Sequence, residues 1–123
     1  MSDERLTVTS ELPRWREIQG HFAPAAIYLD GADGPDVPVT IAAVDASKLV
    51  GSPLSDLHVH DCAEVYLAVA PGLRFAVETD QGFTEVVSPA SVLVPAGVPH
   101  RFVVRDAPET PYVFLGVLLD PGA

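Results

Sequence analysis

Two short blocks of the chain hold most of the side chains that can bind transition metals. The first is residues 58–64, which read HVHDCAE, and the second is residues 95–100, which read PAGVPH. Together they contain three of the four histidines of the chain. Imidazole nitrogens and carboxylate oxygens are common ligands of divalent transition metals. We therefore predict that His58, His60, Glu64 and His100 bind one metal ion.

The spacing within the blocks says how these four side chains can meet. On a strand, His58 and His60 project from the same face because side chains alternate with a period of two. Glu64 has the same parity, but four residues of straight strand at about 3.3 Å each would place it roughly 13 Å from His60. We therefore predict a bend at residues 61–63, where Asp is a favoured turn residue. In the second block, Gly97 can take a positive φ and Pro99 suits the start of a strand, so His100 arrives from a distant strand.

Short strands are the elements that must position these ligands. A chain of 123 residues is the size of one domain, and its twelve prolines and nine glycines separate runs rich in Val, Ile, Leu, Phe and Tyr. This pattern is typical of an all-β sandwich or barrel. A short helix is the alternative to extended or loop structure over residues 12–19 or 46–50. The predicted strands are residues 25–30, 39–45, 57–61, 64–70, 74–79, 84–87, 91–94, 101–105 and 112–119.

The two blocks resemble the paired motifs of the cupin superfamily. The first block gives His-x-His-x3-Glu followed by Gly72, and the second gives Pro-x-Gly-x2-His, so the resemblance spans residues 51 to about 104. It implies an all-β, double-stranded β-helix (jelly-roll) barrel that holds a metal through the four predicted ligands. One or two positions on that metal would be open to water, oxygen or substrate. Residues 21–123 are then expected to form a single cupin barrel domain, and residues 1–20 an N-terminal extension.

The ligand set leaves the metal and the reaction open. Three imidazoles and one carboxylate suit Fe(II), Mn(II), Ni(II), Zn(II), Co(II) or Cu(II). We favour Fe(II), and with it a dioxygenase-type oxidoreductase that acts on a small organic molecule. A redox-inert ion would instead act as a Lewis acid in an isomerase, cyclase, decarboxylase or lyase. A third alternative is a cupin that binds a small molecule without turnover.

Other side chains have predicted places around the metal. Tyr66 shares the parity of Glu64 and is a candidate catalytic acid, base or hydrogen-bond donor, the alternative being a core tyrosine. Candidates for the apolar wall of the pocket are Phe75, Val77, Phe102 and Val104, of which the last two share the parity of His100, and core packing alone would explain all four equally well. His21 lies outside both blocks and is interpreted as an ordinary surface or core histidine.

Composition limits the partners. Seven basic and seventeen acidic residues give 7 − 17 = −10, which repels nucleic acids and anionic membrane surfaces, so a small-molecule substrate is the expected partner. The first residues lack the pattern of a signal peptide, and one cysteine cannot form an internal disulfide, so we expect a cytoplasmic protein. Val65, Leu67 and Val69 face away from the pocket, and either the same chain or the second subunit of a homodimer must cover them.

Overall fold

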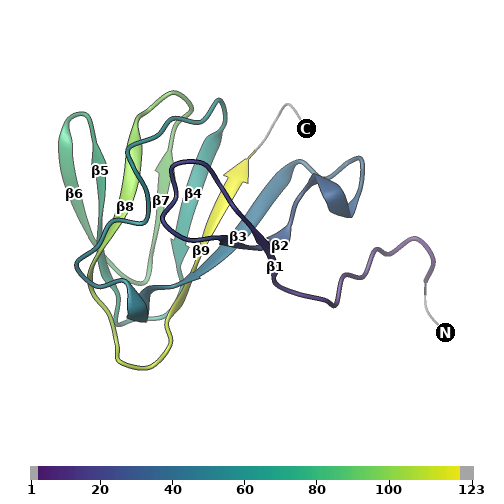
Figure 1. The fold of residues 1–123 in the computed structure, drawn as a ribbon, viewed down its shortest axis with the longest axis horizontal. Coiled ribbons are helices and arrows are strands. Elements are labelled where there is room, and N and C mark those ends of the chain that lie inside the picture. Colours follow the sequence, from purple (N-terminus) through teal and green to yellow (C-terminus); the bar gives the residue numbers. More distant parts are fainter. Residues whose placement is uncertain (1–2, 120–123) are drawn as a thin grey trace.

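Residues 3–119 are described by the computed structural model, and they form two antiparallel sheets that share one interior (Figure 1). The larger sheet has the order β1-β2-β3-β9-β4-β7, and the smaller sheet has the order β6-β5-β8. The strands are β1 (Arg14–Arg16), β2 (Ala25–Leu29), β3 (Val39–Asp45), β4 (Ala63–Ala68), β5 (Arg74–Thr79), β6 (Gly82–Val87), β7 (Ala90–Val94), β8 (His100–Asp106) and β9 (Val113–Leu119), with 3-10 turns η1 (Gly31–Asp33) and η2 (Ala46–Lys48) between them. The predicted all-β class is confirmed.

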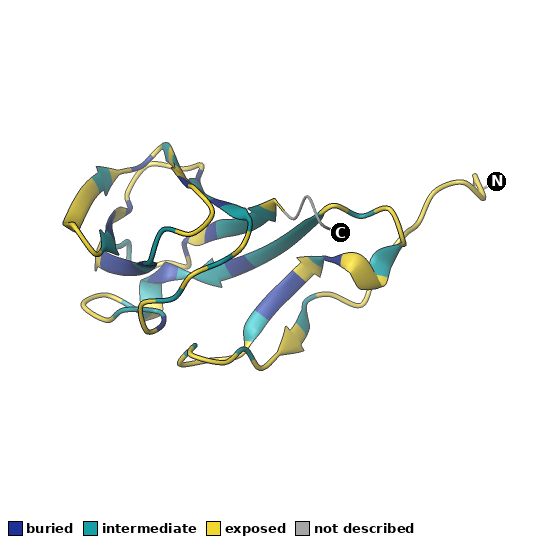
Figure 2. Ribbon diagram, turned by 90° about the horizontal axis from the view of Figure 1, so that it is seen from above, coloured by how far each residue is buried: buried dark blue, intermediate teal, exposed yellow. Residues whose placement is uncertain are grey.

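A stack of three phenylalanine rings joins the two sheets. Phe102 on β8 lies between Phe75 on β5 and Phe114 on β9, with ring centroids 4.4 and 4.2 Å apart. All three side chains are buried. Because Phe114 belongs to the larger sheet and the other two to the smaller one, the stack sets the spacing of the sheets. Figure 2 shows buried residues in the strands that enclose this interior and exposed residues along the N-terminal segment.

Strand β4 shows the predicted alternation. Glu64, Tyr66 and Ala68 are buried, whereas Val65 and Leu67 on its other face are half-buried. Just beyond the strand, Val69 is 68% exposed, so little of the described chain covers this end of the apolar row. A second subunit as the cover stays a prediction.

Residues 49–60 follow the open edge of β8 and form no strand of their own. The amide of Leu54 donates to the carbonyl of Phe102 (3.0 Å), and His58 and His100 exchange two backbone hydrogen bonds of 3.1 and 2.9 Å. The prediction of a strand over residues 57–61 is therefore wrong, because only His58 within it makes a β-bridge. The bridge still places His58 beside His100.

The helix alternative over residues 12–19 is wrong, whereas the short helix over residues 46–50 is borne out in part. Arg14–Arg16 forms the edge strand β1, paired antiparallel with β2, and Ala46–Lys48 forms the single-turn 3-10 helix η2. Among residues 3–119, no helix has the length and hydropathy needed to cross a membrane.

Candidate metal centre and its cavity

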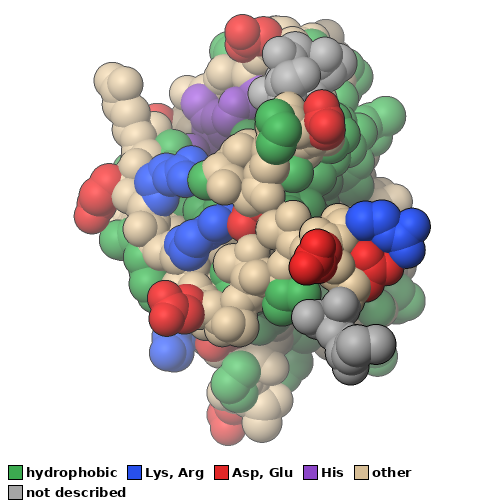
Figure 3. Space-filling model, turned by 90° about the vertical axis from the view of Figure 1, so that its right-hand side faces the viewer, with side chains coloured by type: hydrophobic (Ala, Val, Ile, Leu, Met, Phe, Trp, Pro, Cys, Tyr) green, Lys and Arg blue, Asp and Glu red, His purple; other side chains and the backbone are tan. Residues whose placement is uncertain are grey.

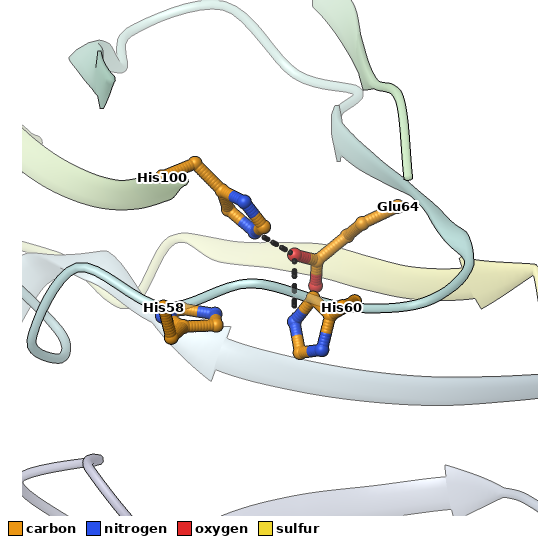
Figure 4. A group of neighbouring side chains, drawn as sticks. All are labelled: His58, His60, Glu64 and His100. Carbon is orange, nitrogen blue, oxygen red and sulfur yellow. Dashed lines mark hydrogen bonds and ion pairs between the residues drawn. The ribbon is translucent and has the colours of Figure 1, made fainter. Parts of the chain in front are cut away.

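The four predicted ligands converge at one place (Figure 4). One donor atom from each of His58, His60, Glu64 and His100 lies within 4.8 Å of the others. His100 Nε2 is 2.8 Å from Glu64 Oε1, and His60 Nε2 is 3.6 Å from the same oxygen. His100 and Glu64 are buried, and the two other histidines are half-buried. The structure thus brings together all four side chains that the spacing singled out.

Three separate segments meet to build this cluster. Glu64 is on β4 in the larger sheet, His100 begins β8 in the smaller sheet, and His58 and His60 come from the segment along the edge of β8. The chain bends at residues 61–62, as the strand-rise argument requires, and this bend returns Glu64 to the histidines. Gly97 has φ +81°, and its amide donates to the carbonyl of His60 at 2.9 Å, so the turn of the second block is tied to the first block.

Backbone carbonyls orient two of the imidazoles. His100 Nδ1 donates to the carbonyl of Val98 at 2.8 Å, and His58 Nδ1 donates to the carbonyl of Asp56 at 2.9 Å. A carbonyl oxygen only accepts, so both Nδ1 atoms carry a proton and the Nε2 atoms are left as the ligand atoms. A hydrogen bond of this kind on the far nitrogen is the usual support of a metal-binding histidine.

The hydrogen bonds and charges within the cluster act mainly on the pKa of Glu64. Burial by itself raises the pKa of this carboxyl, but hydrogen bonds from His100 and His60 outweigh burial and lower the pKa to about 2. Burial opposes a charge on His100, yet its bonds to Glu64 and to the Val98 carbonyl raise its pKa. His58 differs, because burial lowers its pKa. The hydrogen bond between His100 and Glu64 therefore lies where a cation would bind.

The donor set fits a transition-metal ion. Two atoms bound to one ion at about 2.1 Å each lie at most about 4.2 Å apart. The largest separation here is within 4.8 Å, so small side-chain rotations bring the four atoms to bonding distance. Imidazole with carboxylate is also the donor chemistry of Fe(II), Mn(II), Ni(II), Co(II), Cu(II) and Zn(II) sites. These four residues could therefore bind a transition-metal ion, and only the types of the donor atoms indicate which metal it would be.

An apolar cavity of about 140 Å³ opens beside the cluster. The floor is the inner face of the larger sheet, where Gly116 on β9 is paired with Tyr66 on β4 and with Ala42 on β3. Small residues at the centre of the floor leave the space empty, and a Cβ at Gly116 would lie 3.4 Å from Glu64 Oε2. The apolar walls include Ile18, Ile27, Leu54, Phe102, Phe114 and Leu118.

Tyr66 and His21 both line this cavity. Tyr66 is buried, its ring centroid lies 6.2 Å from that of His100, and burial together with the negative charge of Glu64 raises its pKa. His21, interpreted from the sequence as an ordinary histidine, lies with its ring centroid 5.1 Å from that of His58. On the side of the molecule shown in Figure 3, histidine side chains reach the surface. Of the four candidate wall residues, Phe102 lines the cavity, whereas Phe75, Val77 and Val104 belong to the core without lining it.

Solved structures show which fold this is. A cupin domain from Bordetella pertussis is 18% identical, with a TM-score of 0.55 over 85% of this chain and 99% of that one. A cupin protein from Bacteroides fragilis is 13% identical, with a TM-score of 0.56 over 94% and 89% of the two chains. A cupin-like protein from Thermotoga maritima is 12% identical, with a TM-score of 0.61 over 92% and 81%. No family model and no curated protein sequence matches the chain. The chain has the cupin fold, and identities this low carry the fold alone.

Proposed function

We propose that this protein is a metal-dependent enzyme that acts on a small organic molecule, with Fe(II)-dependent, dioxygenase-type oxidation as its reaction. The observation that supports the proposal is the position of the ligand cluster at the wall of an apolar cavity. A buried metal with no adjoining space would serve only the fold. Here the space beside the donors suits a substrate.

The residues of the chain have separate tasks in this proposal. His58, His60, Glu64 and His100 hold the ion, and a set that contains two histidines and a carboxylate is a known donor set of non-haem iron oxygenases. Bound Fe(II) supplies a redox-active centre at which oxygen and the substrate can react. The carbonyls of Asp56 and Val98 keep two imidazoles in the tautomer that ligation needs. The apolar walls exclude water from the reacting groups.

Tyr66 is the candidate catalytic residue besides the ligands. Because its pKa is raised, its hydroxyl keeps its proton near neutral pH and can donate a hydrogen bond to a substrate oxygen. This observation also favours a second function, in which a redox-inert ion polarises a carbonyl and Tyr66 donates to the developing oxyanion. Such chemistry belongs to an isomerase, cyclase, decarboxylase or lyase.

Metal content tests the proposal first. Protein purified without chelators or a metal-affinity tag should carry about one transition-metal ion per chain, and His60→Ala should carry much less. A wild-type protein that neither contains nor takes up Fe(II), Mn(II) or Zn(II) contradicts the proposal. Reactions are then compared across a panel of small phenols and enols. Oxygen consumption that needs iron supports the oxidation, whereas anaerobic turnover with zinc supports the second function, and tight binding without product indicates a binding protein.

A further inference from the structure

The cavity beside the ligands restricts the kind of molecule that can reach the metal. We infer that it takes an uncharged molecule about the size of one six-membered ring, with an oxygen at one end that meets the metal. This inference rests on the proposed function, because it assumes that the cluster holds a metal and receives a small molecule.

The cavity volume limits the size of the ligand. The space is about 140 Å³. An apolar protein cavity of about 150 Å³ binds one benzene molecule, so the space here takes one ring and not two. The volume depends on small residues of the larger sheet, among them Ala42 and Gly116, which are paired on the floor of the cavity. A sugar phosphate or a larger polycyclic molecule would not fit without movement of the sheet.

The side chains that line the cavity limit the charge of the ligand. Among its described lining residues there is no Lys or Arg, and the one acidic side chain is the metal ligand Glu64. Arg14 and Arg16 are on the neighbouring strand β1, but Asp33 and Asp30 bind them with N–O distances of 2.6 Å. Neither guanidinium is left for a ligand in the cavity.

An anionic group at the far end of a ligand would therefore lie against mainly apolar walls, with no Lys or Arg to neutralise its charge. Burying a charge in this way costs much more than burying an uncharged group of the same shape. Away from the metal cluster, Thr40 is the polar side chain on the floor formed by β3, and a hydroxyl can bond to an uncharged oxygen of the ligand. The net charge of −10 also disfavours anionic ligands at long range.

Two phenols of matched shape test the inference on zinc-loaded wild-type protein. 4-Hydroxyacetophenone and 4-hydroxybenzoate share the ring and the phenol oxygen, and they differ in a methyl ketone or a carboxylate at the opposite end. Calorimetry at pH 7 should show that the ketone binds at least about 30-fold more tightly, because the carboxylate has no Lys or Arg to neutralise its charge. A smaller ratio, tighter binding of the carboxylate, or no binding of either phenol overturns the inference.

A variant tests whether the ring occupies the cavity. Ala42→Leu fills the floor of the cavity, so it should weaken binding of the ketone at least 10-fold while zinc affinity changes less than about 3-fold. Val117→Leu on the opposite face of the same sheet is the control and should bind the ketone as the wild type does. Wild-type affinity in folded Ala42→Leu overturns the inference, and if this variant does not fold, the pair of phenols still decides. Failure of the wild type to bind zinc contradicts the proposed function, whereas zinc binding without preference for the ketone overturns only this inference.

Discussion

Replacement of Glu64 by Gln is the most direct perturbation of the metal centre. Gln has nearly the same shape as Glu, but it is neutral, and its amide oxygen is a weaker ligand than a carboxylate. Glu64 lies 2.8 Å from His100 Nε2 and 3.6 Å from His60 Nε2, so the substitution changes the one anionic donor at the centre of the cluster. We expect Glu64→Gln to lose most of its affinity for Zn(II).

The size of the effect follows from linkage. Changing a residue that only supports a ligand costs about 10-fold to 100-fold in metal affinity, so loss of a ligand should cost at least about 100-fold. At a free Zn(II) concentration of about 100 times the wild-type Kd, binding stabilises the wild type by about 2.7 kcal/mol. For a chain of this length that is a rise in Tm of about 10 °C. At the same concentration the variant gains about 0.4 kcal/mol, or about 2 °C.

Thermal unfolding with and without Zn(II) measures this difference, and each variant serves as its own metal-free reference. Glu85→Gln is the matched control, because Glu85 pairs with Arg105 at the surface, where its side chain is 60% exposed. The control should show the full rise in Tm. If Glu64→Gln shows the same rise as the wild type, Glu64 is not a ligand and the four-residue centre is wrong.

Two further predictions concern the metal-free protein. The lowered pKa of Glu64 stabilises the fold above its unfolded-state value of 4.5, and this contribution is lost as pH falls toward about 2. The raised pKa of His100 stabilises the fold below its unfolded-state value of 6.5, and this contribution is lost as pH rises through the raised value. Both pKa shifts describe one ion pair, so urea unfolding should show the greatest stability between about pH 4.5 and 6.5. The pair should add at most about 3 kcal/mol to the free energy of unfolding in this range. If Glu64→Gln has the same pH profile as the wild type, the ion pair is not the cause. Phe102→Ala should lower the free energy of unfolding by about 3–5 kcal/mol, because Phe102 is 1% exposed. The control Phe83→Ala, at a position that is 54% exposed, should lower it by less than about 1 kcal/mol. Similar losses in the two variants would mean that the ring stack does not hold the sheets together.

Local patterns were enough to predict most of the strands. Strand β5 has the predicted bounds, residues 74–79, because its ends are marked by the nearby turn residues Gly72 and Asp80. The inward parity of Glu64 and Tyr66 was also predictable, since alternation is a property of the strand itself. The spacing of the histidines predicted the candidate ligands in the same way.

Long-range contacts decide what the sequence patterns could not. The stretch around His58 has strand-like parity, but its neighbour is the edge of β8, and only one residue makes a bridge there. Phe102 and Val104 have equal parity on β8, yet Phe102 reaches the cavity and Val104 lies in the core, because parity gives the face of a strand and not the depth along it. His21 reaches the cavity because it makes a β-bridge with Ser55, which also lines the cavity. No local pattern contains these contacts.

The position of the candidate ligands implies that a bound metal ion would act on the fold. Glu64 belongs to the larger sheet and His100 to the smaller sheet, so an ion held by both would link the two sheets. The hydrogen bond between the same two side chains already makes such a link. Metal binding would therefore replace this hydrogen bond by bonds to the ion and release a proton, while the stacked phenylalanines would still join the two sheets. A site built in this way is already arranged before the metal arrives, because the backbone bonds between His58 and His100 and between Gly97 and His60 do not depend on the ion.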